Sequence, residues 1–171
     1  MESYEPIFVT FARIHILSMR ARMITERAEL TDVIKRSVYC HLAMTDKEGK
    51  PYVIPMNFGF RDGTIYLHGS QHGKKVTILR ENPDVCINFT TDHLLRYQSE
   101  QVACSWSMKY RSVLCYGRVE FIEDPEEKTV ALNAVMAQYT SRDFSYNPPS
   151  IREVCVWKVV VTKFEGRAYG Y

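Results

Sequence analysis

The sequence has no large excess of charge of either sign. Its 22 Lys and Arg residues against 20 Asp and Glu residues leave a formal net charge of +2, and the basic residues are spread along the chain. A protein that binds nucleic acid usually gathers its basic residues so that they neutralise many phosphates. Nucleic acid is therefore not the first partner to expect.

The sequence also lacks a cysteine pattern that would hold a metal or a redox pair. Its five cysteines are widely spaced, mostly lie in apolar runs and form no Cys-x-x-Cys pair. No Cys and His pair has the spacing of a structural zinc site. We expect reduced thiols that pack as small apolar side chains, a cytoplasmic protein and no bound metal.

No hydrophobic run is long enough to cross a membrane. The most apolar stretch, IFVTFARIHIL at residues 7–17, contains Arg13 and His15 and has no basic region before it. A transmembrane helix needs about 20 apolar residues, and a secretory signal begins with positive charge. We therefore expect neither a signal nor an anchor, and interpret residues 1–23 as an N-terminal extension of one domain, residues 24–171, with residues 1–18 loosely attached.

The common catalytic and nucleotide-binding motifs are absent. The sequence contains neither a Walker phosphate-binding loop nor the dinucleotide glycine pattern, and it has no nucleophile elbow, spaced carboxylate pair or HExxH motif. Strands and helices also do not alternate as they do in a doubly wound sheet. Hydrolysis by the common routes and nucleotide binding on such a sheet thus have no visible basis.

The sequence does contain a series of strand patterns separated by turns. We predict strands at residues 38–45, 51–60, 64–69, 84–91, 107–124 and 153–166. The first three are joined by the turns DKEGK and RDG and are expected to form a meander. Pro55 suits an edge strand or bulge, and Gly117 predicts a bulge. About six antiparallel strands with few helices predict a mainly β protein, a barrel or a sandwich.

Short helices are predicted between the strands. The predicted segments are residues 24–37, 73–83 and 124–139, with residues 141–150 as a loop. Thr25 is the candidate cap of the first helix, Pro83 ends the second, and Asp124 followed by Pro125 begins the third.

The segment LHGSQHGKK, residues 67–75, carries the clearest chemical signal. It places a strand end, a glycine-bearing loop, Lys74, Lys75 and a helix start close together. The unpaired N–H groups of a helix start and two ammonium groups suit a phosphate. The alternative is that Gly69 and Gly73 serve turn geometry and that the lysines are solvated.

Two further segments, IPMNFGF at 54–60 and SWSMKYRSV at 105–113, have the residue types that a flat aromatic cofactor needs. The residues that could supply an apolar wall, backbone polar groups and a stacking partner are Pro55, Met56, Asn57 and Trp106. The alternative is that they belong to the core. His41 and His68 lie on predicted strands, where a histidine is usually a hydrogen-bonded side chain. Arg111 could face an anion or pair with a surface carboxylate.

Together these segments resemble the FMN-binding split-barrel family related to pyridoxamine 5′-phosphate oxidase, in the branch of the 5-nitroimidazole resistance (Nim) proteins. The resemblance runs from about Ile24 to Phe164. It is carried by CHLAMTDKEGKPYVIPMNFGFRDGTIYLHGSQHGKKVTILRENPDVCINF, by SWSMKYRSVLCYGRVEFIEDPEEK and by the helix and final strand that follow. It implies a six-stranded antiparallel split barrel, and a homodimer with two equivalent FMN sites at its interface.

The resemblance also implies roles for individual residues. Pro55, Met56 and Asn57 would lie along the isoalloxazine ring. The edge of the ring would approach His68, the candidate catalytic residue, and Ser70.

The remaining implied contacts concern the phosphate and the partner subunit. Gly73, Lys74 and Lys75 would hold the FMN phosphate, in agreement with the electrostatic argument. Trp106, Tyr110 and Arg111 would reach the flavin from the partner subunit. The C-terminal FEGRAYGY does not reproduce the region that gives the oxidases their specificity for pyridoxamine phosphate.

The leading functional hypothesis is an FMN-dependent oxidoreductase that passes electrons from a donor to a small electrophile such as a nitro compound. One alternative is a flavin or haem binding module, for which His68 and His72 would be the haem ligands to inspect. Another is oxidation of pyridoxamine 5′-phosphate. The fold alone does not decide among these functions.

Overall fold

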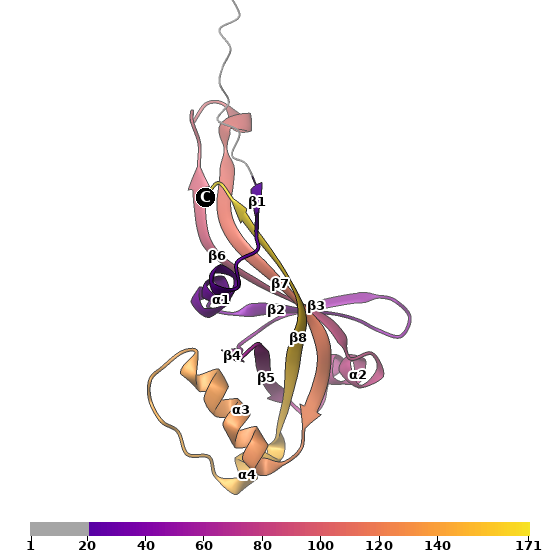
Figure 1. Cartoon of the computed structure of the whole chain (residues 1–171). Helices are drawn as coiled ribbons and strands as arrows, with labels where there is room; N and C mark the ends of the chain where they lie inside the picture. Colours follow the sequence, from indigo (N-terminus) through magenta and orange to yellow (C-terminus); the bar gives the residue numbers. More distant parts are fainter. Residues whose placement is uncertain (1–20) are drawn as a thin grey trace, which may run out of the picture.

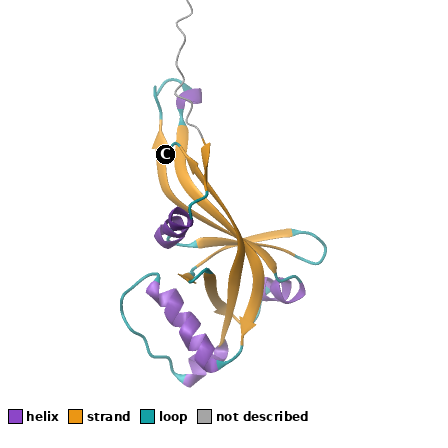
Figure 2. Cartoon of the chain, in the orientation of Figure 1, coloured by secondary structure: helices purple, strands orange, loops and turns teal. Residues whose placement is uncertain are grey.

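One antiparallel sheet of eight strands runs through residues 21–171, the part of the chain that the computed structural model describes (Figures 1 and 2). Its strands are β1 (Ala21–Ile24), β2 (Cys40–Thr45), β3 (Pro51–Met56), β4 (Gly59–Arg61), β5 (Thr64–Ser70), β6 (Asp84–Arg96), β7 (Ser107–Ile122) and β8 (Val154–Tyr169). Their order is β3-β2-β6-β7-β8-β5-β4, with β1 beside β8. Strands β3 and β4 end this order without pairing to each other, so the barrel is split.

Four α-helices and one short 3₁₀ turn connect the strands. They are α1 (Arg27–Arg36), α2 (Lys74–Glu81), α3 (Pro125–Ala137), α4 (Pro148–Glu153) and the turn Ala103–Ser105. The predicted start of α3 is confirmed, since the Asp124 side chain accepts hydrogen bonds of 2.9 Å from the N–H groups of Glu126 and Glu127. None of the described helices is long and apolar enough to span a membrane.

The strand β8 organises the sheet. It pairs with β7 along its length, and its other edge pairs first with β5 and then with β1. The predicted bulge at Gly117 is confirmed by a register shift there, where a Cβ atom would lie 2.6 Å from Val159 Cγ1. Ala21 to Met23 of the predicted extension thus belong to the sheet, and residues 1–20 lie outside the described part.

The predicted meander is wrong. Strand β3 pairs only with β2, whereas β4 pairs with β5 at the far end of the sheet. The chain leaves the sheet at Asn57 because Phe58 is fully buried, with its ring edge-on to Phe89, and its N–H donates to the Tyr139 hydroxyl at 3.1 Å. A long-range contact therefore divides the predicted strand 51–60 into two strands.

Two helix predictions also need correction. Thr25 does not cap α1, because the N-cap residue is Glu26 and no side chain makes the cap bond. Part of the predicted loop 141–150 forms the start of α4, where the Asn147 side chain accepts from the Ser150 N–H at 2.8 Å and Pro148 occupies the first turn. The sequence Asn-Pro-Pro is typical of such a start.

The two faces of the sheet differ in what covers them. The main core lies on the face that carries Phe89, Val113 and Trp157, where α1 and α2 bury their apolar residues. On the opposite face α3 packs near Ile122 and Val156. The rest of that face, which we call the outer face, carries the residues His41, Cys86, Asn88, Leu114, Tyr116 and Tyr110, which are half-buried with no described helix packed over them.

Strands β6 and β7 continue past the rest of the sheet. Strand β8 stops pairing with β7 at Tyr110, so residues 94–109 form a two-stranded projection, the β6–β7 arm (Figure 1). The arm carries the exposed apolar residues Leu94, Leu95, Tyr97, Val102, Trp106 and Met108. All five cysteines are free thiols, and one of them, Cys104, is exposed on this arm.

Candidate functional site

The start of α2 has the features that suit an anion. Gly73 is the N-cap with φ of 112°, a conformation that favours glycine, and no side chain caps the helix. Lys74 and Lys75 are its first two residues, and no acidic residue lies in the first turn. The first turn of α2 thus offers uncapped N–H groups, the positive end of the helix dipole and two ammonium groups, a combination that suits an anion.

Contacts of the two lysines bring α2 to both sides of the split. Lys74 Nζ lies 4.6 Å from the centre of the Tyr52 ring on β3. The Lys75 side chain lies over Gly69 on β5, where a Cβ atom would be 3.1 Å from Nζ and 3.5 Å from Cη2 of Trp157. The segments predicted from sequence to bind a cofactor ring and a phosphate are thus joined across the open edge of the barrel.

His68 precedes Gly69 on β5, and its side chain lies on the opposite face of the strand from the contact of Gly69 with Lys75 and Trp157. It is half-buried on β5 opposite Val156, and its Nδ1 atom is buried without a hydrogen-bond partner in the described residues. Burial, and then the positive charge of Lys75, lower the pKa of the imidazole. His68 is therefore neutral at pH 7, with one ring nitrogen able to donate and one able to accept.

The other predicted residues of this group lie at the rim of the split. Ser70 is exposed, and its hydroxyl accepts from the His72 N–H at 3.2 Å, which shapes the loop before α2. Pro55 pairs with His41 and lies on the edge strand β3, as expected for a residue without an N–H donor. Met56 is half-buried against the core and Asn57 is exposed.

Trp106 and Tyr110 lie in a different part of the chain. The Trp106 ring stacks on Tyr97 at 4.2 Å within the β6–β7 arm, and Tyr110 stacks on Tyr169 at 5.9 Å. Trp106 adjoins the far end of β6, and α2 adjoins its start, so they are separated by roughly 40 Å at about 3.3 Å per residue. Trp106 therefore cannot contact a ligand at α2 of its own chain.

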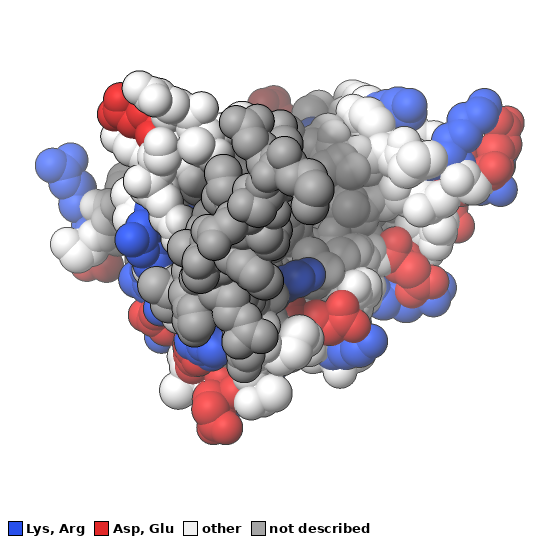
Figure 3. All heavy atoms as spheres, turned by 90° about the horizontal axis from the view of Figure 1, so that it is seen from above, with Lys and Arg blue, Asp and Glu red and all other residues white. Residues whose placement is uncertain are grey.

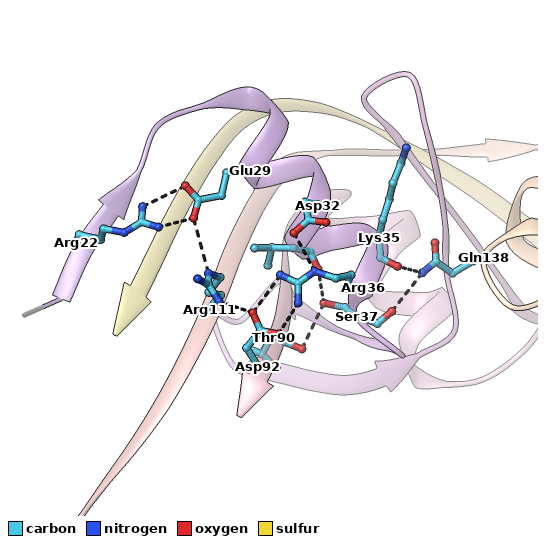
Figure 4. Close-up of polar contacts among 11 residues, drawn as sticks. Arg22, Glu29, Asp32, Lys35, Arg36, Ser37, Thr90, Asp92, Arg111 and Gln138 are labelled. Atoms are coloured by element: carbon cyan, nitrogen blue, oxygen red, sulfur yellow. Dashed lines mark hydrogen bonds and ion pairs between the residues drawn. The ribbon is translucent and has the colours of Figure 1, made fainter. Parts of the chain in front are cut away.

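Arg111 takes part in a network of ion pairs (Figure 4). Its guanidinium binds Asp92 at 2.6 Å and approaches Glu29 at 3.7 Å, while Arg36 also pairs with Asp92. These hydrogen bonds, that of Arg36 first, hold the pKa of Asp92 below its usual value. The positive charge of Arg111 is thus balanced by carboxylates of its own chain.

Charge on the face shown in Figure 3 is mixed in sign. Lys and Arg side chains there lie among Asp and Glu side chains, and the described chain contains several exposed pairs such as Arg118 with Asp84. No three or more His, Cys, Asp and Glu side chains gather as a metal site within residues 21–171. The lysines at α2 are therefore the best-defined anion site among the residues described.

The architecture corresponds to a known family. A family model described as pyridoxamine 5′-phosphate oxidase matches residues 26–168. The chain belongs to this family. The resemblance expected from the sequence is thereby confirmed, and with it the split-barrel fold.

Solved structures agree with membership of the pyridoxamine 5′-phosphate oxidase family. A putative 5-nitroimidazole antibiotic resistance protein from Bacteroides thetaiotaomicron is 43% identical, with a TM-score of 0.79 and 88% of each chain covered. An FAD and heme binding protein from Mycobacterium smegmatis shares the fold, with 18% identity and a TM-score of 0.75. The match covers 87% of this chain and 74% of that protein. An FAD-binding protein from Mesorhizobium loti (22%, TM-score 0.63) is covered over 99% of its length by 88% of this chain, and likewise shares the fold. No curated protein matches the chain.

Sequence reasoning missed two residues that contact the lysines of the candidate site. Tyr52 contacts Lys74, and it could have been found because it alternates with Ile54 and Met56 on the same face of β3. Trp157 adjoins Gly69 and Lys75, and its buried Nε1 has no partner in the described residues. It reads as an ordinary core residue in the sequence, so no local pattern reveals it.

Proposed function

We propose that the chain is an FMN-dependent oxidoreductase that reduces a small electrophile such as a nitro compound. The observation that carries this proposal is the anion cradle of Gly73, Lys74 and Lys75 at the split, with Lys74 joined to Tyr52 of β3. Membership of a flavin-binding family and similarity to the Bacteroides protein support it.

The residues at the split fit a flavin mononucleotide. The cradle offers two cations and free N–H groups to a phosphate. Gly69 has no side chain that would fill the space taken by Lys75, and His68 Nδ1 is buried without a partner.

The protein's residues bind and orient the flavin and shield it from water. The flavin, when bound, supplies the electron-transfer chemistry. Lys74 and Lys75 would hold the phosphate, and Pro55, Met56 and Asn57 would contact the flavin ring. His68 is neutral and can exchange a hydrogen bond with the ring edge or with the substrate.

The active form in this proposal is a homodimer. The outer face carries the half-buried Leu114 and Tyr116, and a buried Asn88 Oδ1 without a partner in the described residues. A second copy packed on this face by a twofold axis covers it. The β6–β7 arm of one copy then extends past its own fold, and Trp106 and Tyr110 approach the flavin of the other.

Replacement of both cradle lysines tests the site. We expect Lys74→Ala with Lys75→Ala to weaken FMN binding by about tenfold or more, because two charge-assisted contacts to the phosphate are lost. Titration of the apoprotein with FMN, followed by quenching of flavin fluorescence, measures the affinity. The control is Lys47→Ala with Lys50→Ala, which removes the same charge from exposed positions on the β2–β3 turn. Equal weakening in both double variants would contradict the assigned cradle.

The description of the matching family model favours a second candidate, oxidation of pyridoxamine 5′-phosphate. That reaction releases peroxide, and the proposed reduction of an acceptor does not require it. Peroxide production with pyridoxamine 5′-phosphate, together with no NADH- or NADPH-driven reduction of nitroaromatic compounds, would favour this candidate over the proposed one.

A further inference from the structure

A cavity lies away from the split, between β4, the last turns of α3 and residues 140–144 of the loop that follows α3. Its volume is about 460 Å³, within the range of small-molecule sites. Figure 1 shows the segment after α3 as a wide loop beside the helix. The cavity lies under this loop, with Phe60 and Arg61 on the β4 side.

The loop that encloses the cavity is held at both ends. At one end, the Gln138 side chain donates to Lys35 O at 2.8 Å, and the Tyr139 hydroxyl accepts from Phe58 N–H at 3.1 Å. At the other end, Tyr146 packs against the smaller apolar cluster and Asn147 caps α4. The floor is also fixed, since a Cβ atom on Gly59 of β4 would overlap the Ala134 backbone of α3. The cavity is thus built by contacts of the fold.

The residues around the cavity combine apolar rings with unpaired positive charge. Phe60 and Phe144 both line it, and Phe144 is an exposed ring. Arg61 and Arg142 line it as well, and neither makes an ion pair with a carboxylate of residues 21–171, whereas Arg22, Arg36 and Arg111 all do. Asp143 is the one carboxylate among the lining residues, so the lining carries two positive charges and one negative charge.

We propose that this cavity binds a small planar compound that carries one acidic group, a carboxylate or a phosphate. The phenyl rings provide apolar contact for the planar part. The two guanidinium groups provide charge-assisted hydrogen bonds for the acidic group, a geometry to which arginine is well suited. The proposal concerns a site separate from the flavin cradle and does not depend on the redox reaction.

The test compares two probes that differ only in charge. Naphthoate carries a carboxylate on a flat ring, and naphthalenemethanol carries a neutral hydroxymethyl group instead. Equilibrium dialysis against the purified full chain measures both. We expect saturable binding of naphthoate at one site per chain, and about tenfold weaker binding or more in the variant Arg61→Ala with Arg142→Ala. Asp143→Asn is expected to strengthen naphthoate binding, because it removes the repelling carboxylate. Naphthalenemethanol should bind wild type more weakly and be unaffected by either variant.

Matched controls separate this site from general charge effects and from the flavin cradle. Arg96→Ala with Arg152→Ala removes the same charge from exposed positions outside the cavity and should leave naphthoate binding unchanged. Circular dichroism establishes that each variant is folded. The proposal is overturned if naphthoate shows no saturable binding, if both arginine double variants weaken it equally, or if Lys74→Ala with Lys75→Ala is the variant that abolishes it.

Discussion

At the scale of the residue, Asp92 joins parts of the chain that are far apart in the sequence. Its carboxylate pairs with Arg36 of α1 and Arg111 of β7, and its carbonyl oxygen accepts from the Tyr171 hydroxyl at 2.7 Å. It has φ of 58° at the register shift of β6, a conformation that Asp adopts more readily than most residues. Asp92 thereby braces the base of the β6–β7 arm.

Replacing Asp92 tests this bracing role and its pH dependence. Because the folded pKa of Asp92 is below its usual 3.8, the ionised form stabilises the fold above the unfolded pKa and loses this effect as pH falls through the folded value. We expect Asp92→Asn to lower the free energy of unfolding by about 1–2 kcal/mol at pH 7, with a difference that shrinks below about pH 4. Urea denaturation at several pH values measures this free energy.

The control is Asp32→Asn, which breaks only a more exposed pair with Arg36. It should lower the free energy of unfolding by about 0.5 kcal/mol or less. A pH-independent difference for Asp92→Asn would contradict the account.

At the scale of the element, the sequence predicted those helix ends and bulges that depend on residues close together in the chain. The start of α3, the end of α2 and the bulge at Gly117 were all predicted from capping residues, proline and glycine. The partner of β4 could not be predicted, because it depends on Phe58 burying itself against Phe89 and on its bond to Tyr139. The ion pairs of Arg111 also join residues that are distant in the sequence. The sequence alone therefore did not decide whether Arg111 binds an anion or pairs with a surface carboxylate.

A comparison of two helix N-caps tests whether a local side-chain bond stabilises α3. Asp124→Ala removes the side chain that accepts from two N–H groups at the start of α3. We expect a loss of about 1 kcal/mol in the free energy of unfolding. Glu26→Ala is the matched control, since Glu26 is the N-cap of α1 but makes no side-chain cap bond. It should change stability by less than about 0.5 kcal/mol. Equal losses in the two variants would show that the cap bond of Asp124 contributes nothing particular.

At the scale of the whole molecule, the anion cradle and the arm lie at opposite ends of the β6–β7 ladder. The helix α2, whose first turn forms the anion cradle, leads into the start of β6, while Trp106 stacks on Tyr97 beyond the end of β6. A single chain cannot bring the two together, whereas a twofold dimer through the outer face can. The two groups of candidate site residues could therefore be predicted from the sequence. The distance between them within one chain could be found only from the structure.

Mixing two defective variants tests whether the arm acts on the partner. One variant carries Lys74→Ala with Lys75→Ala, and the other carries Tyr97→Ala with Trp106→Ala. If the arm of one copy completes the site of the other, each mixed dimer has one intact site. Unfolding and refolding an equal mixture should then restore FMN binding to about a quarter of all sites, since half of the dimers are mixed. No recovery, although light scattering shows mixed dimers, would show that the arm does not serve the partner's site.

The most direct test of the central claim is the absorbance spectrum of the freshly purified protein, with identification of any chromophore released by heat. The account predicts bands near 370 and 450 nm, roughly where oxidised flavin absorbs, and FMN in the supernatant. A Soret band with no flavin bands would instead indicate a haem-binding module. A colourless protein that also failed to take up added FMN would contradict the proposed function and leave the split-barrel fold without a flavin.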